Sequence, residues 1–206
     1  AMFTGIVTAI GTIAATEQRG DLHVRIACPF DPDRIGIGAS IACSGVCLTV
    51  TERGGTPGDA WFAVDVSQET VSRTVPGQWE EGRRLNLEPS LRLGDELGGH
   101  LVTGHVDAVG EVAQARRVDG SIHLEVRAPK ALAPFIAPKG SITVDGVSLT
   151  VNAVEDEADG AARFALNIIP HTGEVTTLGH LAEGDRVNLE IDVLARYLKR
   201  MQALAG

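Results

Sequence analysis

A glycine-rich segment near the middle of the chain carries two side chains suited to proton transfer. Residues 98–105 read Gly-Gly-His-Leu-Val-Thr-Gly-His, so His100 and His105 lie five positions apart. Histidine titrates near neutral pH, and either residue could therefore donate or accept a proton in a reaction. A lone histidine is more often structural than catalytic, and a zinc site here would lack its third and fourth ligands. Taken alone, the segment favours a structural role for each histidine, with acid–base chemistry as the alternative.

Two similar segments, Ser-Gly-Val-Cys-Leu-Thr-Val and Asp-Gly-Val-Ser-Leu-Thr-Val, present a thiol and hydroxyl groups. Side chains alternate along a strand, so Cys47 shares a face with Thr49, and Ser148 shares a face with Thr150. These groups could orient a nucleophile or bind a polar substrate. The alternative is that small polar residues fill a tight barrel interior. No motif gives Cys47 a His/Asp partner, so a triad nucleophile is not supported.

Both motifs belong to an internal repeat, which is the main organising feature of the chain. Four blocks recur in the same order at offsets of 99 to 102 residues, whereas chance similarity between β-rich segments would not preserve their order. The matching blocks are 4–11 with 103–110, 40–50 with 141–151, 62–70 with 164–172, and 82–88 with 184–190. We therefore expect two domains, 2–98 and 99–192. His105 replaces Ile6 of the first copy and Cys47 replaces Ser148 of the second, which suggests specialised roles.

The elements that position these residues are predicted to be mostly strands. Apolar and polar residues alternate in 23–26, 84–88, 123–127 and 186–191, as in strands with one face in water, and glycine-rich turns separate them. About six short strands per copy favour an all-β fold of two tandem six-stranded barrels, since closing a sheet removes its edges. Short helical pieces are expected near 31–35, 67–73 and 129–135.

The last segment, 193–206, is different. Val193 to Ala205 contains no glycine or proline, and its apolar residues recur at spacings of three and four, which predicts an amphipathic helix. The apolar stripe could pack on its own barrel or on copies from other subunits, and the pattern alone does not decide between these.

Composition excludes several classes of function. The net charge of −9 argues against a nucleic-acid partner, and no apolar run reaches the roughly 18–20 residues of a membrane span. Three cysteines without a secretory signal suggest reduced thiols in the cytosol, and no second Cys or His pair completes a metal set. No phosphate-binding or dinucleotide fingerprint is present. A flavodoxin-like or reductase fold would need alternating strands and helices, which are missing.

Taken together, these segments resemble the riboflavin synthase α-chain family. The opening Met-Phe-Thr-Gly-Ile-Val, the glycine–histidine joint and the paired Leu-Thr-Val segments match the family's motifs, and the match runs from Met2 to about Asp192. The resemblance implies that each half is a six-stranded Greek-key barrel that binds one 6,7-dimethyl-8-ribityllumazine. One lumazine then donates a four-carbon unit to the other, giving riboflavin and 5-amino-6-ribitylaminouracil without cofactor or metal. It further implies a cytoplasmic homotrimer held by its C-terminal helices, with active sites between barrels of neighbouring subunits, and association with lumazine synthase.

The resemblance also implies the site residues. The expected catalytic residues are His105, Cys47, Ser40 and His100. The expected substrate contacts in the first barrel are Gly5, Ile6, Val7, Cys47, Leu48, Thr49, Asp65, Val66, Ser67, Gln68, Glu69 and Thr70. Those in the second barrel are Gly104, His105, Val106, Lys139, Ser148, Leu149, Thr150, Ile169, Pro170, His171, Thr172, Gly173 and Glu174. His171 stands where Glu69 predicts a second acidic residue, so no common carboxylate role is assigned.

The chemistry fits such a protein. The 7-methyl group of lumazine is acidic because its carbanion delocalises into the ring, so the substrate is its own electron sink. The protein must mainly hold two rings face to face. The nearest rival is a non-catalytic, antenna-type lumazine-binding protein of the same fold. Such proteins tend to lose ligand-binding residues in one half, whereas both Leu-Thr-Val segments, His105 and Cys47 are present here.

Overall fold

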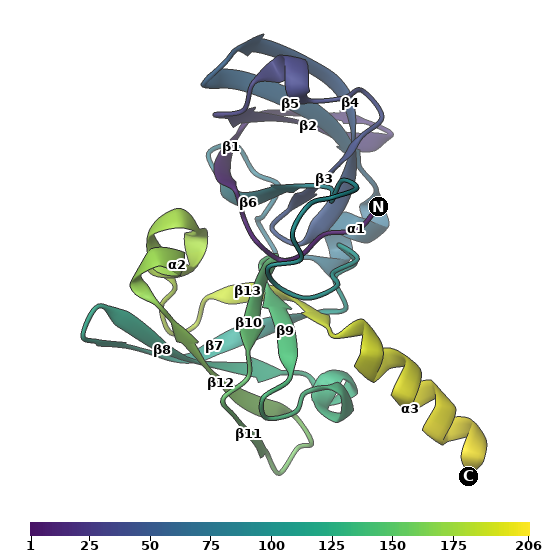
Figure 1. The fold of residues 1–206 in the computed structure, drawn as a ribbon, viewed down its shortest axis with the longest axis vertical. Helices are drawn as coiled ribbons and strands as arrows, with labels where there is room; N and C mark the ends of the chain where they lie inside the picture. The colour runs from purple at the N-terminus through teal and green to yellow at the C-terminus, as the bar shows by residue number, and fades with distance from the viewer.

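The first half of the chain folds as a closed antiparallel barrel. The computed structural model describes residues 1–206, and Figure 1 shows two β-structures stacked along the long axis with a helix at the C-terminus. The barrel order is β1-β2-β5-β4-β3-β6. Its strands are β1 (Ala9–Arg19), β2 (Asp21–Cys28), β3 (Ser40–Cys43), β4 (Val46–Thr56), β5 (Asp59–Val66) and β6 (Arg84–Pro89).

The second half repeats this arrangement as a half-barrel of seven strands in the order β10-β9-β13-β7-β8-β12-β11. They are β7 (Ala108–Val118), β8 (Ser121–Ala128), β9 (Ser141–Val144), β10 (Val147–Thr150), β11 (Ala153–Asp156), β12 (Ala162–Ile168) and β13 (Arg186–Ile191). The prediction of two barrel domains in a mostly β chain is confirmed, with one difference in the second sheet.

The difference is that β10 and β11 together replace the single long strand β4. The Val151 N–H donates to the Gly140 carbonyl and the Asn152 N–H to the Ala165 carbonyl, both at 2.9 Å. Two successive residues thus bond to segments on opposite sides, Gly140 next to β9 and Ala165 in β12, and the strand is interrupted at this point. In the first barrel a bulge between Val50 and Glu52 makes the same bend without ending the strand.

Strands β6 and β13 each lie between the core of their own barrel and the contact between the two barrels. In β6, Leu85 and Leu87 point into the core, and Asn86 and Glu88 point to the opposite face. The prediction that this opposite face lies in water is wrong, because Asn86 is 1% exposed and Glu88 6%. The other barrel covers it, and β13 buries Asn188 and Glu190 in the same way.

Asn188 shows why these polar residues are tolerated at the contact. Its side-chain oxygen accepts the Val75 N–H at 2.9 Å, and its nitrogen donates to the Ser44 carbonyl at 2.9 Å and to Gln78 Oε1 at 2.6 Å. Asn86 makes the corresponding bonds to the second barrel. Satisfied in this way, a buried amide costs little and fixes one arrangement of the barrels.

The short helices lie close to where the sequence predicts them. They are 3-10 helices at Pro32–Arg34 and Lys130–Phe135 and helix α1 (Gln68–Arg73), with α2 (Pro170–Val175) and a 3-10 helix at Thr177–His180 in the second half. Ser67 caps α1 by accepting the Thr70 N–H.

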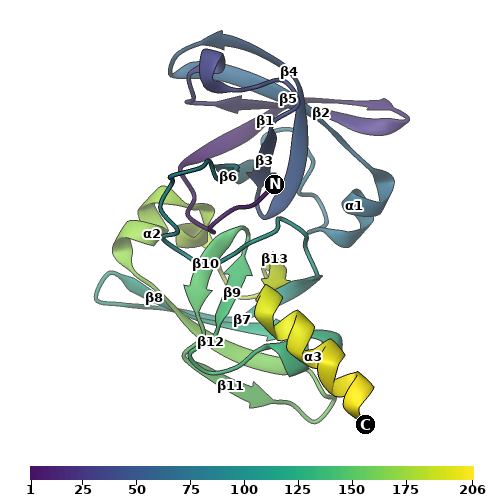
Figure 2. The ribbon, with the colours of Figure 1, turned by 45° about the vertical axis from the view of Figure 1, so that its right-hand side comes forward.

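The predicted C-terminal helix is confirmed as α3 (Val193–Ala205), capped by Asp192. It extends away from the barrels in both views (Figures 1 and 2). Its own barrel leaves the apolar stripe 61–67% exposed, at Leu194, Tyr197, Leu198, Met201 and Leu204. No helix of the protein has the length and apolar character needed to cross a membrane.

Candidate functional site

Two short segments exchange places between the barrels. We call residues 3–7 the first arm and residues 102–106 the second arm. They meet at a bridge in which the Phe3 N–H donates to the Val102 carbonyl at 2.8 Å and the Val102 N–H donates to the Phe3 carbonyl at 3.0 Å. From this bridge each arm continues to the barrel formed by the other half of the chain.

The first arm lies on the second barrel. The Ser148 N–H donates to the Gly5 carbonyl at 2.8 Å, and Val7 packs against the second core. Gly5 has a φ of +79°, and a Cβ added there would lie 2.5 Å from the Ser148 Cβ. Only glycine combines this conformation with so close an approach.

The second arm lies on the first barrel in the same way. The Cys47 N–H donates to the Gly104 carbonyl at 2.8 Å, and Val106 packs against the first core. The sequence-based grouping is therefore wrong, because it put Gly5 with Cys47 and Gly104 with Ser148. A repeat shows which residues correspond, but not which barrel an arm contacts.

A depression of about 320 Å³ on the first barrel brings several predicted residues together. Cys47, Glu69, Thr70, Gly104 and His105 line it. The assignment of His105 to the second barrel is thus corrected: it shares a depression with Cys47.

The strand alternation explains why the thiol is accessible. Leu48 is buried in the first core, while Cys47 is half-buried and Thr49 exposed on the outer face. The alternative that Cys47 and Thr49 fill the barrel interior is therefore wrong.

The corresponding place on the second barrel holds a different polar pair. His100 Nδ1 lies 2.6 Å from the Ser148 hydroxyl oxygen, and the His100 N–H donates to the Thr4 carbonyl at 3.0 Å. Burial lowers the pKa of His100, although the negative charge of Asp192 opposes this. A neutral imidazole can accept a hydrogen bond from the serine hydroxyl, which increases the basicity of the serine oxygen.

Lys139 is unusual in this second region. It has a φ of +64°, and its N–H donates to the Val151 carbonyl at 2.7 Å. The first barrel has Gly38 in this position, with a φ of +84°. A lysine in the left-handed region costs on the order of 1 kcal/mol. The presence of lysine where the first barrel has glycine is therefore consistent with a role for the lysine side chain.

Other predicted residues are not gathered around these places. Ser40 lines a separate depression with Thr8, Phe30 and Arg92. The Asp65 carboxylate lies 2.8 Å from His23 Nδ1 on the outer face of β5. Ile169 is the N-cap residue of α2, and the segment from Pro170 to Glu174 lies within this helix, with Ile169 and His171 exposed.

The structure also identifies residues that the sequence interpretation missed. Asn167 pairs with His123 as Asp65 pairs with His23, so it is the true counterpart of Asp65. Glu88 and Glu190 bind the two arms through backbone N–H groups. The repeated Asn-Leu-Glu motif was the available signal for the glutamates, and the repeated histidine was the signal for Asn167.

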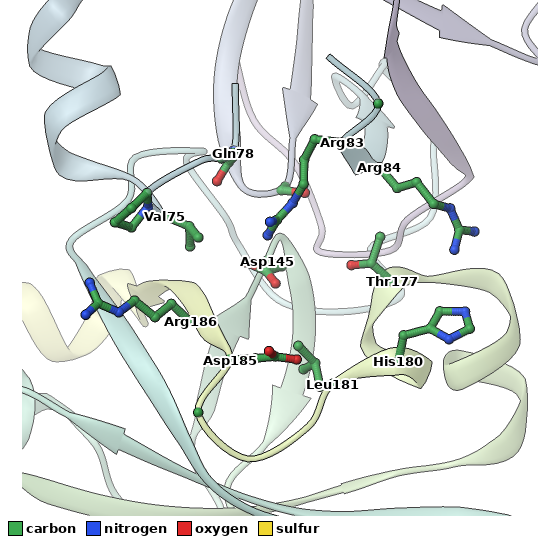
Figure 3. A pocket seen from close by; sticks show the side chains of 14 residues that line it. Val75, Gln78, Arg83, Arg84, Asp145, Thr177, His180, Leu181, Asp185 and Arg186 are labelled. Atoms are coloured by element: carbon green, nitrogen blue, oxygen red, sulfur yellow. The ribbon is translucent and has the colours of Figure 1, made fainter. Parts of the chain in front are cut away.

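A further depression of about 590 Å³ lies between the barrels, and none of the predicted site residues lines it. Figure 3 shows Arg83, Arg84 and Arg186 around it, with Asp145 in its centre. Burial raises the pKa of Asp145 to about 7, against the opposing effects of the Asn188 N–H and the Arg83 charge. Asp145 Oδ1 accepts the Asn188 N–H at 2.8 Å within the second barrel. The Asp145 backbone carbonyl accepts a hydrogen bond from Asn86 Nδ2 of the first barrel at 2.9 Å, so the residue lies at the contact between the barrels.

Comparison with known proteins gives consistent matches along the chain. The lumazine binding domain family matches twice, over residues 4–90 and 103–192. The riboflavin synthase of Brucella abortus is 47% identical over 97% of this chain and 98% of its own. That of Mycobacterium bovis is 42% identical over the full length of both. Among solved structures, LumP in complex with riboflavin superimposes with a TM-score of 0.74 at 26% identity, covering 92% of this chain and 98% of LumP. LumP with 6,7-dimethyl-8-(1'-D-ribityl) lumazine gives 0.73 at 25% identity, with the same coverage.

Proposed function

The chain belongs to the lumazine-binding-domain family and, within it, to the riboflavin synthases, and on this premise we propose how its residues carry out the reaction. The reaction transfers a four-carbon unit between two molecules of 6,7-dimethyl-8-ribityllumazine, giving riboflavin and 5-amino-6-ribitylaminouracil. The duplicated barrel suits a reaction with two identical substrates, because it supplies two related places to bind them.

One observation carries our proposal: each place combines an arm from one half with a strand from the other. The first combines His105 with Cys47, and the second combines Gly5 with Ser148 and His100. We assign one lumazine to each. Holding the two rings in reacting geometry can remove on the order of 7–11 kcal/mol from a bimolecular barrier. We assign proton transfer at the acidic methyl and at the leaving amine to His105 and to the His100–Ser148 pair.

We further propose that the active protein is a homotrimer in which the first barrel of one subunit faces the second barrel of its neighbour. Two features support this. The apolar stripe of α3 is uncovered, and the first-barrel depression is only partly enclosed. The three unpaired cysteines suit a reducing compartment such as the cytoplasm, where we also expect association with lumazine synthase.

Fluorescence tests the activity directly. The purified chain, treated with a chelator, is mixed with the lumazine alone, and riboflavin emission is followed. We expect riboflavin to form at the same rate with and without the chelator. Tight lumazine binding with no riboflavin formed would instead indicate a ligand-carrying protein of the same fold, and a rate restored only by added metal would contradict the proposed chemistry.

A further inference from the structure

Two buried carboxylates, Glu88 on β6 and Glu190 on β13, have no part in the chemistry proposed above. They are 6% and 4% exposed, and neither has an ion-pair partner. A buried carboxylate without a cation must be satisfied by hydrogen-bond donors. The donors around these two come from the arms.

Glu88 binds the first arm with both of its oxygens. Oε1 accepts the Thr4 N–H at 2.7 Å and the Thr4 hydroxyl at 2.9 Å, and Oε2 accepts the Gly5 N–H at 3.1 Å. Glu190 repeats this pattern on the second arm. It accepts the Thr103 N–H at 2.8 Å, the Gly104 N–H at 3.1 Å and the Thr103 hydroxyl.

These contacts cross between the barrels. Glu88 is part of the first barrel, yet the glycine it binds accepts the Ser148 N–H of the second barrel at 2.8 Å. Glu190 is part of the second barrel, yet the glycine it binds accepts the Cys47 N–H of the first barrel at 2.8 Å. Each carboxylate thus binds the N–H of the same glycine whose carbonyl contacts the site on the opposite barrel.

We propose that Glu88 and Glu190 are positioning residues that act crosswise: Glu88 sets the geometry of the second-barrel site, and Glu190 sets that of the first. Two acceptor oxygens facing two consecutive N–H groups fix the orientation of the arm, which a single acceptor would not. The orientation of the Gly104 peptide in turn determines where His105 lies relative to Cys47. The part of this inference that concerns ligand binding rests on the proposed function.

Hydrogen exchange of the ligand-free full-length protein tests the crosswise action. Glu190→Gln replaces one acceptor with an NH₂ group that faces an N–H donor, so the arm hydrogen bonds should open more often. We expect exchange at the Cys47 amide to rise by at least about 10-fold, the change expected for losing one bond to a charged group. The Ser148 amide should stay within about twofold of wild type. Glu88→Gln should give the reverse pattern.

Two further sets of variants separate positioning from general destabilisation. Thr4→Val and Thr103→Val remove the hydroxyl donor to the glutamate, and Thr4→Val also removes the 3.3 Å acceptor of the Ile6 N–H. Both variants should give smaller effects on the same opposite barrel as the matching glutamine variant. Glu111→Gln is the charge-matched control, because the Glu111 side chain is exposed on β7 and makes no hydrogen bond or ion pair. Its exchange should match wild type at both amides.

Titration with 6,7-dimethyl-8-ribityllumazine adds a second readout. Wild type should bind two molecules per chain, and each glutamine variant should keep one site near wild-type affinity and weaken the other by at least about 10-fold. Faster exchange in the carboxylate's own barrel, equal effects in both barrels, or no change at all would overturn the crosswise assignment. A wild-type protein that binds no lumazine would count against the proposed function instead, and the exchange pattern of the free protein would still decide the role of the carboxylates.

Discussion

Replacing Asp145 by asparagine should make the stability of the protein less dependent on pH. The buried carboxyl has a pKa of about 7 in the folded protein and an ordinary value of 3.8. Between these values the folded state binds a proton that the unfolded chain releases. The wild type should therefore lose stability as the pH rises from about 4 to about 7, and should lose no more above that. The full difference corresponds to at most about 4 kcal/mol.

Asparagine is a close substitute, because it keeps an oxygen to accept the Asn188 N–H and tolerates the φ of +48° at this position. Urea unfolding of both proteins from pH 4 to pH 8 at one protein concentration measures the effect, since other titrating groups are common to both. The advantage of Asp145→Asn over wild type should grow from near zero at pH 4 to its maximum above pH 7. A difference that does not change with pH would refute the reasoning. Asp145→Ser, which copies Ser44 of the first barrel, should show the same trend.

Three further predictions concern the sites and the assembly. The variants His105→Gln and Cys47→Ser should each retain most of the lumazine affinity. Each should lower the single-turnover rate by about 10²-fold, near the low end for acid–base groups. Unchanged rates with lower thermal stability would show that both residues are structural. Gly5→Ala should weaken lumazine binding at the second barrel, because the added Cβ would lie 2.5 Å from the Ser148 Cβ. The control Gly20→Ala has a similar φ of +85° but meets no atom within 4 Å, so it should cost only about 1–2 kcal/mol of stability. Equal ligand affinity in the two variants would contradict this. Deleting 193–205 should give monomers in sedimentation experiments that bind lumazine but turn over slowly, and a fully active monomer would exclude the inter-subunit site.

The fold could be predicted from the sequence because duplication preserves the residues that a barrel needs. The Leu-Thr-Val segments, the alternating strands and the amphipathic stripe of α3 each leave a local pattern, and the structure confirms them. The broken strand at Val151 was not predictable, since its bend depends on hydrogen bonds to two neighbouring strands.

The site was predictable only in part, because its assembly depends on contacts between the halves. Alternation placed Cys47 and Thr49 on one face correctly, but the same pattern in β6 was interpreted as a face in water. A period of two identifies the polar face of a strand without showing what covers it. His105 and Cys47 line one depression only because the arms are exchanged, and no local sequence pattern exists for that exchange.

That exchange also suggests how such a chain could arise. The two arms run past each other at the bridge between Phe3 and Val102, and each lies on the other half's barrel. An ancestor with a single barrel could have made the same contacts only by pairing with an identical molecule, as a symmetric domain-swapped dimer. Fusion of two gene copies would then have preserved an existing interface and made the partner's arm permanently available. Once joined, the copies were free to diverge, and one copy now has Cys47 where the other has Ser148.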